Sequence, residues 1–444
     1  MMPRSIRFVC CVAALCIGLV QAAHAVTVQR VVSPGGIEAW LVEDHTNPII
    51  AMRFVFRGGA ALDPKGKDGT AKLVTTLLDE GAGDLGAQAF QRRLEDLGVS
   101  LGFDAGLDVF GGSLRTLTEH RDDAFDMARM ALTQPRFDDD AVERMRSQHL
   151  AKVRRTSERP GATAFYTMQE TFFAGHPYAR RSDGTEQTIA ALTTDDLRGF
   201  VKGRFARDNL VIGVVGDMTP EDLAIVLDQT FGGLPAHAAP WDVAETRPNA
   251  CGAEIVKRHA VPQSSILFGH EGLKRDDPDY YVAVVLNYIL GGGTFNSRLF
   301  EEVREKRGLA YSVDSFLYPM DYAAMLLGNA GTANARVKET VEVVRTIWKD
   351  VKENGVTETE VNDAKTYLTG SFPLRFSSSP SIAGILAAMQ LDDLGIDYLE
   401  RRNAIIEAIS LADVNTLAAR LLDPQKLTFF IVGEPEGLAT TACP

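Results

Sequence analysis

Two side chains in the second half of the sequence, Arg304 and Tyr311, have the types and spacing needed for electrostatic catalysis. Arg304 falls on the last turn of a helix predicted over 296–307, and Tyr311 falls on a strand predicted to begin at Leu309. Both are hydrogen-bond donors, so together they could hold a peptide carbonyl and the oxyanion that it becomes. The alternative is structural: Arg304 pairs with Glu301 on a solvated helix face, and Tyr311 is a half-buried strand residue.

Glycines stand at both ends of this helical segment. Gly308 is placed where a left-handed C-terminal cap is expected. Gly291, Gly292 and Gly293 form a run ahead of the helix. Such a run serves either as a flexible turn between helices, because glycine adopts many backbone conformations, or as a place where a partner or peptide backbone passes close. The pattern leaves both interpretations open.

The first 25 residues have the organisation of a secretory signal peptide. Arg4 and Arg7 precede an apolar run over 8–20, and Ala23-His24-Ala25 fits a small-residue cleavage site. The apolar run is too short to span a bilayer, and no later stretch approaches about 20 uninterrupted apolar residues. We therefore expect cleavage after Ala25, a periplasmic mature protein and no membrane contact.

Charge and cysteine content limit the classes of partner. The formal net charge is −13, and loss of the basic leader makes the mature chain more acidic still. Nucleic acid is not expected as a partner, because its binding requires basic patches. Cys251 and Cys443 remain after the leader is removed. An oxidising compartment permits a bridge between them, but two cysteines do not make a disulfide scaffold, and the sequence leaves the bridge open.

An internal repeat is the main structural signal. The length of 444 residues favours two domains of about 200 residues each. Segments 90–101 and 300–311 share the order helix, glycine, strand, and each half closes on a predicted strand that ends in Val-Gly-acid, at 215–217 and at 432–434. Two copies of one unit are therefore predicted.

We predict an α+β fold of two homologous domains, each a mixed antiparallel sheet with helices, facing each other across a cleft. The first domain is expected over 26–235 and the second over 251–444. Residues 236–250 are rich in Ala and Pro without periodicity, so they are expected to form the linker. The first domain is expected to open with a β-meander of three strands within 27–56.

Four motifs in a fixed order carry a family resemblance. They are His176-Pro177-Tyr178 followed by Gly184-Thr185, the segments 192–197 and 209–217, and above all the segment 291–311. On these residues the chain resembles the pitrilysin/insulinase family of zinc metallopeptidases, in its smaller bacterial form related to mitochondrial processing peptidase. The resemblance covers essentially the whole mature chain.

The resemblance implies a chamber between two similar domains that admits extended peptides. One domain of such enzymes carries an H-x-x-E-H zinc motif on a helix, in which two His hold the metal and Glu takes a proton from zinc-bound water. The opposing domain contributes an Arg and a Tyr seven residues apart. Arg304 and Tyr311 match these two in type and spacing.

The helix expected to carry zinc, predicted over 70–79, departs from the family pattern. Lys72 and Thr76 stand where the two His should be, and Thr75 stands where the Glu should be. Lysine has no free lone pair at neutral pH, and a lone hydroxyl is a poor zinc ligand. The later metal-binding Glu would fall on the helix predicted over 138–157, near Glu143, Met145 and His149, but the pattern does not assign it to one residue. We therefore expect no metal in this chain.

These expectations lead to a hypothesis of divided labour. The chain is expected to be the non-catalytic subunit of a periplasmic zinc endopeptidase that cleaves unstructured peptides. It would donate Arg304 and Tyr311 to a homologous H-x-x-E-H partner subunit, which would hold the zinc, and it would be inactive alone. The alternative is an inactive peptide-binding or assembly protein of the same fold, with no role in proteolysis.

Overall fold

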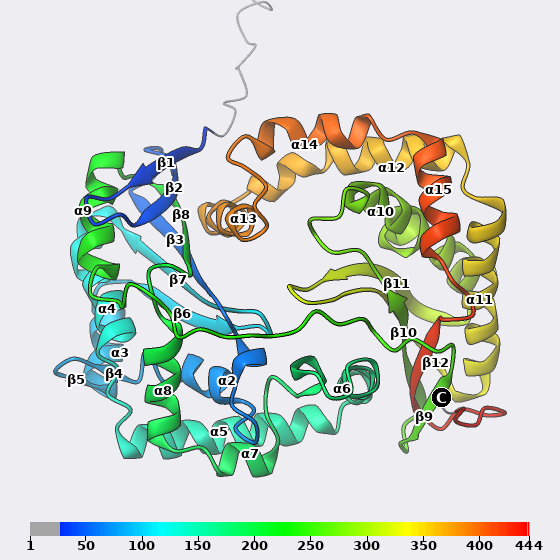
Figure 1. Cartoon of the computed structure of the whole chain (residues 1–444), viewed down its shortest axis with the longest axis horizontal. Coiled ribbons are helices and arrows are strands. Elements are labelled where there is room, and N and C mark those ends of the chain that lie inside the picture. Colours follow the sequence, from blue (N-terminus) through cyan, green and yellow to red (C-terminus); the bar gives the residue numbers. More distant parts are fainter. Residues whose placement is uncertain (1–26, 442, 444) are drawn as a thin grey trace, which may run out of the picture.

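The computed structural model describes residues 27–441 and Cys443. The predicted signal peptide lies outside the described residues. Within them, no helix combines the length and apolar character that a membrane crossing requires. Two sheets with their helices form the two halves of the molecule and face each other (Figure 1). The predicted α+β class, with two related halves of mixed sheet and helices, is confirmed.

The first sheet has six strands in the order β1-β2-β8-β3-β7-β6. Their bounds are β1 (Gln29–Val32), β2 (Glu38–Glu43), β3 (Ile49–Arg57), β6 (Ser100–Ala105), β7 (Val109–Leu117) and β8 (Leu210–Gly216). The predicted β-meander is wrong, because β8 is inserted between β2 and β3 and runs parallel to β2. Hydrophobic pattern sets which residues form strands, but neighbours in the sheet are chosen by the whole chain.

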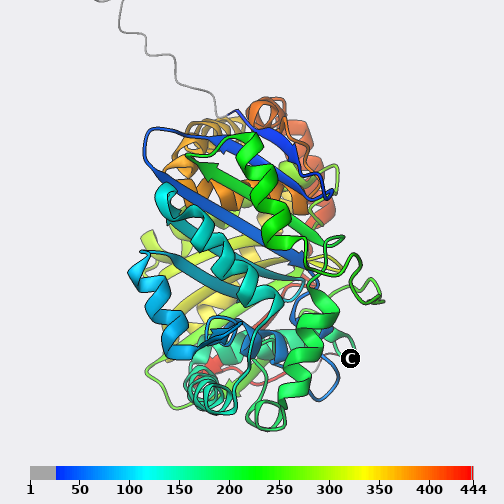
Figure 2. The same cartoon turned by 90° about the vertical axis from the view of Figure 1, so that its left-hand side faces the viewer.

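The helices of the first half include both segments predicted over 70–79 and 138–157. They are α2 (Thr70–Thr75), α3 (Ala87–Asp96), α4 (Arg121–Thr133), α5 (Asp139–Ser157), α6 (Pro160–Phe172), α7 (Glu186–Ala190), α8 (Thr194–Arg204) and α9 (Pro220–Phe231), and the short strands β4 (Gly81–Ala82) and β5 (Leu85–Gly86) form a separate hairpin. α4 and α9 lie on the outer side of the sheet, toward the viewer in Figure 2. α2 is shorter than predicted, since the chain turns after Thr75.

The second sheet has five strands in the order β11-β12-β10-β13-β9. The strands are β9 (Glu254–Arg258), β10 (Gln263–Glu271), β11 (Ala310–Pro319), β12 (Ala324–Ala333) and β13 (Thr428–Gly433), and the helices are α10 (Tyr280–Asn287), α11 (Val337–Asn354), α12 (Glu358–Gly370), α13 (Ser379–Leu391), α14 (Tyr398–Glu407) and α15 (Leu411–Leu421). The last strand of each half runs parallel to an early strand and antiparallel to the next, β8 beside β2 and β3, and β13 beside β9 and β10. The two sheets therefore repeat one topology.

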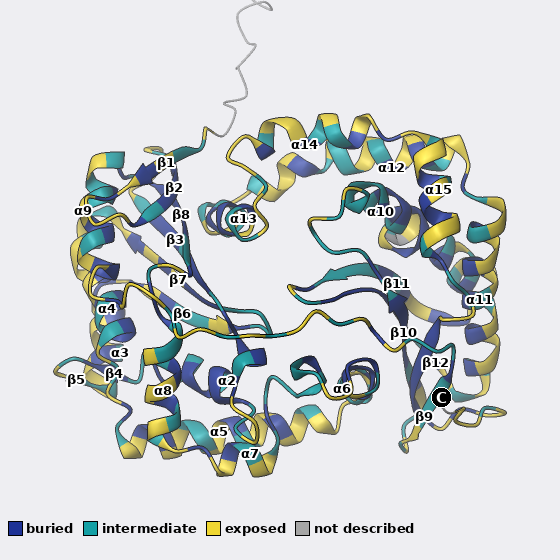
Figure 3. Ribbon diagram, viewed as in Figure 1, coloured by how far each residue is buried: buried dark blue, intermediate teal, exposed yellow. Residues whose placement is uncertain are grey.

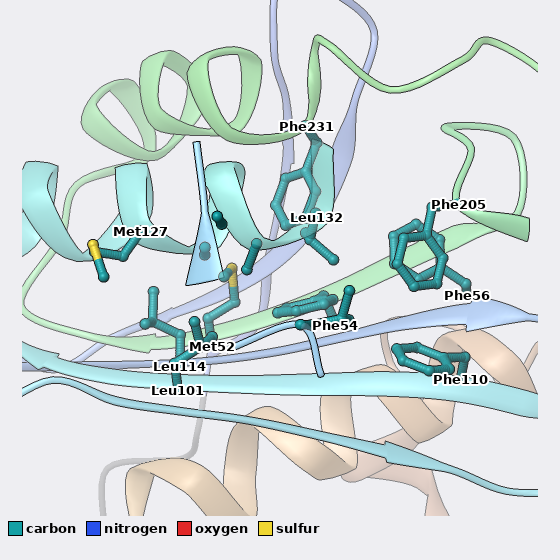
Figure 4. Packing of buried hydrophobic residues seen from close by; sticks show 14 of the residues in the cluster. Met52, Phe54, Phe56, Leu101, Phe110, Leu114, Met127, Leu132, Phe205 and Phe231 are labelled. Atoms are coloured by element: carbon teal, nitrogen blue, oxygen red, sulfur yellow. The ribbon is translucent and has the colours of Figure 1, made fainter. Parts of the chain in front are cut away.

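Each sheet packs its own helices over an apolar core. In the first half, aromatic side chains from strands and helices interlock, with the rings of Phe56 and Phe205 stacked 4.7 Å apart (Figure 4). In the second half, α11 buries Val341, Val344 and Trp348 and exposes its other side (Figure 3). This spacing is that of an amphipathic helix on a sheet. The core of the second half includes Leu299, Val303 and Val313, so it fixes the segments on either side of Gly308.

The two halves also exchange a helix. α6, from the first half, packs on β10 and β13 of the second sheet, and α13, from the second half, packs on β3 and β8 of the first. Gly213 of β8 permits this approach, because a Cβ there would lie 2.4 Å from the carbonyl oxygen of Ala383. The amide of Gln390 donates to the carbonyl of Ile212 at 2.8 Å. The halves are thus joined by packing as well as by the connecting segment.

The segment 236–250 contains no helix or strand and is held by both halves. The indole nitrogen of Trp241 donates to the hydroxyl of Tyr322 at 3.1 Å, and the guanidinium of Arg204 lies over the Trp241 ring. At the end of this segment Cys251 forms a disulfide with Cys443. The bridge that the sequence left open therefore fastens the C-terminal tail beside β9.

Candidate functional site

The segment after α10 is built from tight and wide helical turns. It forms a π-helical turn over Tyr288–Gly292, a 3₁₀ turn over Thr294–Asn296 and a second π-helical turn over Phe300–Glu305. The helix predicted over 296–307 is present over a shorter range, with Arg298 and Leu299 α-helical and the rest in the second π-helical turn. The amide of Lys306 donates to the carbonyl of Glu301, five residues back, at 2.9 Å. Apolar spacing does not distinguish the two helix types, and π turns are frequent at functional sites.

The three glycines ahead of this turn fit close packing within the chain. A Cβ on Gly291, Gly292 and Gly293 in turn would lie 2.5 Å from the Ser315 nitrogen, 2.6 Å from Asn287 Nδ2 and 2.7 Å from the Tyr288 carbonyl oxygen. Asn287 and Ser315 also exchange two hydrogen bonds, of 2.8 and 3.2 Å. Gly291 therefore packs against β11, while Gly292 and Gly293 pack against the end of α10 and the turn that follows it.

Arg304 and Tyr311 line one pocket. The pocket has a volume of about 330 Å³ and also includes Gly291, Gly292, Phe295, Phe300 and the β11 residues 312–316. The guanidinium carbon of Arg304 lies 4.8 Å from the ring centre of Phe300 and 4.7 Å from that of Tyr311. Gly308 has φ of +58°, so the chain turns back at the expected place. The structure thus brings together the pair predicted from the sequence.

The structural alternative for this pair is not what the chain adopts. Glu301 pairs with Lys306 at 2.9 Å, and the carboxylate nearest to Arg304 among the described residues is that of Glu305, 4.0 Å from Nε. Tyr311 is 82% exposed rather than half-buried. Arg304 is therefore held by two aromatic rings and keeps its donors available, an arrangement that orients the cation for an incoming acceptor.

A second arginine anchors the segment. Arg298 donates through Nε and Nη2 to both carboxylate oxygens of Glu360, at 2.7 and 2.9 Å, and through Nη1 to Asp350 at 2.9 Å. Burial opposes ionisation of Glu360, but the bonds from Arg298 and Thr357 outweigh it and lower the pKa of Glu360 to about 2. These contacts fix the start of the helical turn to α11 and α12. The sequence analysis missed them because the partners are 52 and 62 positions away.

The degenerate zinc positions on α2 do not form a donor set for a metal. The hydroxyl of Thr75 donates to the carbonyl of Lys72 at 2.7 Å, and that of Thr76 donates to Leu73 at 2.8 Å. Across residues 27–441, no three His, Cys, Asp or Glu side chains are grouped to hold a metal ion. On α5, His149 contacts the carbonyl of Asp183 at 2.8 Å, and burial lowers its pKa. The residues present do not fit the zinc site of the resembling enzymes.

Comparison with known proteins supports this description. A family model described as the peptidase M16 inactive domain matches residues 191–368. The crystal structure of a peptidase M16 inactive domain from Pseudomonas fluorescens has a TM-score of 0.86 at 30% sequence identity, and the match covers 94% of this chain and 99% of that chain.

Two further relatives extend over most of the sequence. A non-peptidase homolog from Helicobacter pylori, YmxG, is 29% identical over 394 residues, which are 88% of this chain and 90% of the relative. The mitochondrial-processing peptidase subunit beta of Saccharomyces cerevisiae is 25% identical over 345 residues, 74% of each chain. The resemblance found in the sequence is confirmed, and the chain belongs to the peptidase M16 family as a member of its inactive type.

Proposed function

We propose that this protein is the non-catalytic subunit of a periplasmic zinc endopeptidase and donates Arg304 and Tyr311 to a zinc site held by a homologous H-x-x-E-H subunit. The observation that carries the proposal is the state of Arg304, whose side chain lies between two rings in a pocket without a hydrogen bond to any described residue, in a chain whose α2 offers no metal ligand. The yeast relative is by name one subunit of a processing peptidase, which supports assembly with a second chain.

The chemistry of the pair follows from its donors. Zinc in the partner would supply the activated water that attacks the peptide carbonyl carbon. Negative charge then gathers on the carbonyl oxygen. The guanidinium of Arg304 and the hydroxyl of Tyr311 would donate hydrogen bonds to that oxygen, and preorganised donors of this kind stabilise a transition state more than its ground state. The rings of Phe300 and Tyr311 keep the guanidinium in place before substrate arrives.

Reconstitution tests the proposal. The mature chain is purified with and without the H-x-x-E-H protein encoded nearest to it, and cleavage of an unstructured peptide is measured. We expect cleavage only from the mixture, and chelation of zinc should abolish it. Cleavage by this chain alone, removed by a chelator, contradicts the proposal. N-terminal sequencing of the exported protein, with Val26 as the expected first residue, tests the periplasmic location separately.

A second candidate function is an inactive peptide-binding or assembly protein. The observation in its favour is the Helicobacter pylori relative, whose name describes a non-peptidase. This candidate predicts that addition of the chain leaves the cleavage rate of the H-x-x-E-H protein unchanged. The same mixing experiment therefore separates the two candidates.

A further inference from the structure

The three arginines of the segment 298–307 differ in what satisfies their donors. Arg298 is bound by two carboxylates, and Arg307 is bound by the carboxylate and carbonyl of Glu302. The side chain of Arg304 makes no hydrogen bond to any described residue, although a guanidinium has five N–H donors. Its carbon is flanked by the rings of Phe300 and Tyr311, which cannot accept those bonds in the way that an oxygen does. Arg304 is thus a cation with unused donors.

Two pockets meet at this cation. Arg304 and Tyr311 line both the 330 Å³ pocket beside the glycine run and a 510 Å³ pocket on the other side, which includes Gln263 and 331–333. Internal carboxylates compete weakly for the guanidinium. Glu305 lies at 4.0 Å and is mostly exposed, so solvent screens the pair. Asp314 lines the first pocket but accepts a bond from Asn329 at 2.7 Å, and burial raises its pKa.

We propose that the 330 Å³ pocket lined by Arg304 and Tyr311 binds the C-terminal α-carboxylate of a peptide, and that the chain does so without a partner subunit. A carboxylate presents two coplanar oxygens, which match the guanidinium fork and accept two parallel N–H bonds. A carboxamide or an internal peptide carbonyl offers a single oxygen and no charge. The ring of Tyr311 lies against the same guanidinium, and this exposed residue carries a hydroxyl that can serve as a further donor. The pocket therefore distinguishes a free C-terminus from a blocked one.

The source of this ligand rests on the proposed function. Hydrolysis breaks the C–N bond of the peptide, joins the water oxygen to the carbonyl carbon and sends one water proton to the leaving amine; the second is released as the new acid ionises. The carbonyl oxygen that Arg304 would hold in the transition state becomes one oxygen of the new carboxylate. The ligand would then be the N-terminal product fragment, retained by Arg304 after cleavage.

A matched pair of peptides tests the inference. The probe is a fluorescein-labelled octapeptide of Gly, Ala and Ser ending in a free carboxylate, compared with the same peptide ending in a carboxamide. Fluorescence anisotropy on the isolated full mature chain should show binding of the acid about tenfold tighter than the amide, the difference between charged and neutral hydrogen bonds. Arg304→Gln should abolish this preference. Arg307→Gln should retain it, because Arg307 is already occupied by Glu302.

Equal affinity of the wild-type chain for the acid and the amide overturns the inference, and so does a preference that survives Arg304→Gln. The wild-type comparison does not depend on whether a variant folds. The two proposals also fail in different ways. Loss of cleavage by the mixed subunits in Arg304→Gln, without any acid preference in the isolated chain, overturns carboxylate binding alone. An acid preference combined with unchanged cleavage in that variant overturns the catalytic role alone.

Discussion

At the scale of residues, type and spacing were enough to single out Arg304 and Tyr311, and the structure brings them together in one pocket. Phe300, an apolar residue of the same helical turn, supports Arg304 with its ring, a role that its residue type alone does not predict. Arg298 has the same residue type as Arg304 and the opposite environment. Nothing local in the sequence separates an anchoring arginine from an available one, because the anchoring carboxylates lie on other helices.

The catalytic role predicts a kinetic defect in the assembled enzyme. Arg304→Ala or Tyr311→Phe should lower kcat/KM of the mixed subunits by roughly 10²-fold, the scale of losing one oxyanion donor. Arg307→Ala should leave it nearly unchanged, since that side chain bonds Glu302. Steady-state cleavage of an unstructured peptide measures the effect. Unaltered kcat/KM in both site variants would return the pair to a structural role.

At the scale of elements, the predicted helices and strands are largely present, and the errors lie where backbone contacts over long separations decide. The first π turn ends in the glycine run, where Gly291 packs against β11, and no hydrophobic period encodes this contact. β8 pairs with β3 although the two strands are more than 150 positions apart in the sequence. Local pattern gives the element, and packing gives its neighbour.

The close contact between Gly291 and β11 predicts a loss of stability when one methyl group is added at this glycine. Gly291→Ala places a Cβ 2.5 Å from the backbone nitrogen of Ser315, which cannot move without disturbing β11. We expect the free energy of unfolding to fall by roughly 1–3 kcal/mol, as for overpacked sites. The control is Gly331→Ala, where no atom lies within 4 Å. Urea unfolding monitored by circular dichroism measures the free energy of unfolding of both variants. Equal values would contradict a close contact between Gly291 and β11.

The Arg298 anchor predicts a stability contribution that depends on pH. The pKa of Glu360 is lowered from 4.5 to about 2 in the folded chain. A lowered carboxyl pKa stabilises the fold above the unfolded value of 4.5, and this contribution is lost as pH falls toward 2. Discounted for partial exposure, Glu360→Gln should cost about 1–2 kcal/mol at pH 7 and much less near pH 2.5. Urea denaturation at both pH values tests this, and a cost independent of pH would exclude the ionic anchor.

At the scale of the whole molecule, the internal repeat predicted two related halves. It did not predict that α6 and α13 each pack on the sheet of the other half. Each of these helices has an apolar face whatever it packs on, so its sequence carries no sign of which sheet receives it. Because of this exchange, the two halves share a packed interface. A pocket of about 250 Å³ lies on that interface, where the β6–β7 turn meets the β11–β12 turn.

One carboxylate, that of Asp108, accepts two hydrogen bonds at this pocket. Asp108 accepts a hydrogen bond from the hydroxyl of Tyr178 at 2.6 Å and one from the backbone nitrogen of Asp321 at 3.2 Å. Asp321 and Asp392 line the same pocket, with Arg275 bonded to Asp392 at 3.2 Å. Burial raises the pKa of all three carboxyl groups, that of Asp108 to about 6. Ionisation therefore places several negative charges where the two turns touch.

The raised pKa of Asp108 sets the sign of a pH effect on this contact. The pKa of the Asp108 carboxyl rises from 3.8 to about 6 on folding, so its protonated form stabilises the contact between the two turns below about pH 4. This stabilisation is lost as pH rises through 6. Hydrogen exchange of the backbone amides of residues 320–323, corrected for intrinsic rates, should therefore be several-fold faster at pH 8 than at pH 5. Asp108→Asn should remove most of this dependence, while Asp104→Asn, in an exposed ion pair on β6, should keep it. Protection that does not change with pH in the unmodified chain would show that the charge of Asp108 does not govern how the halves meet.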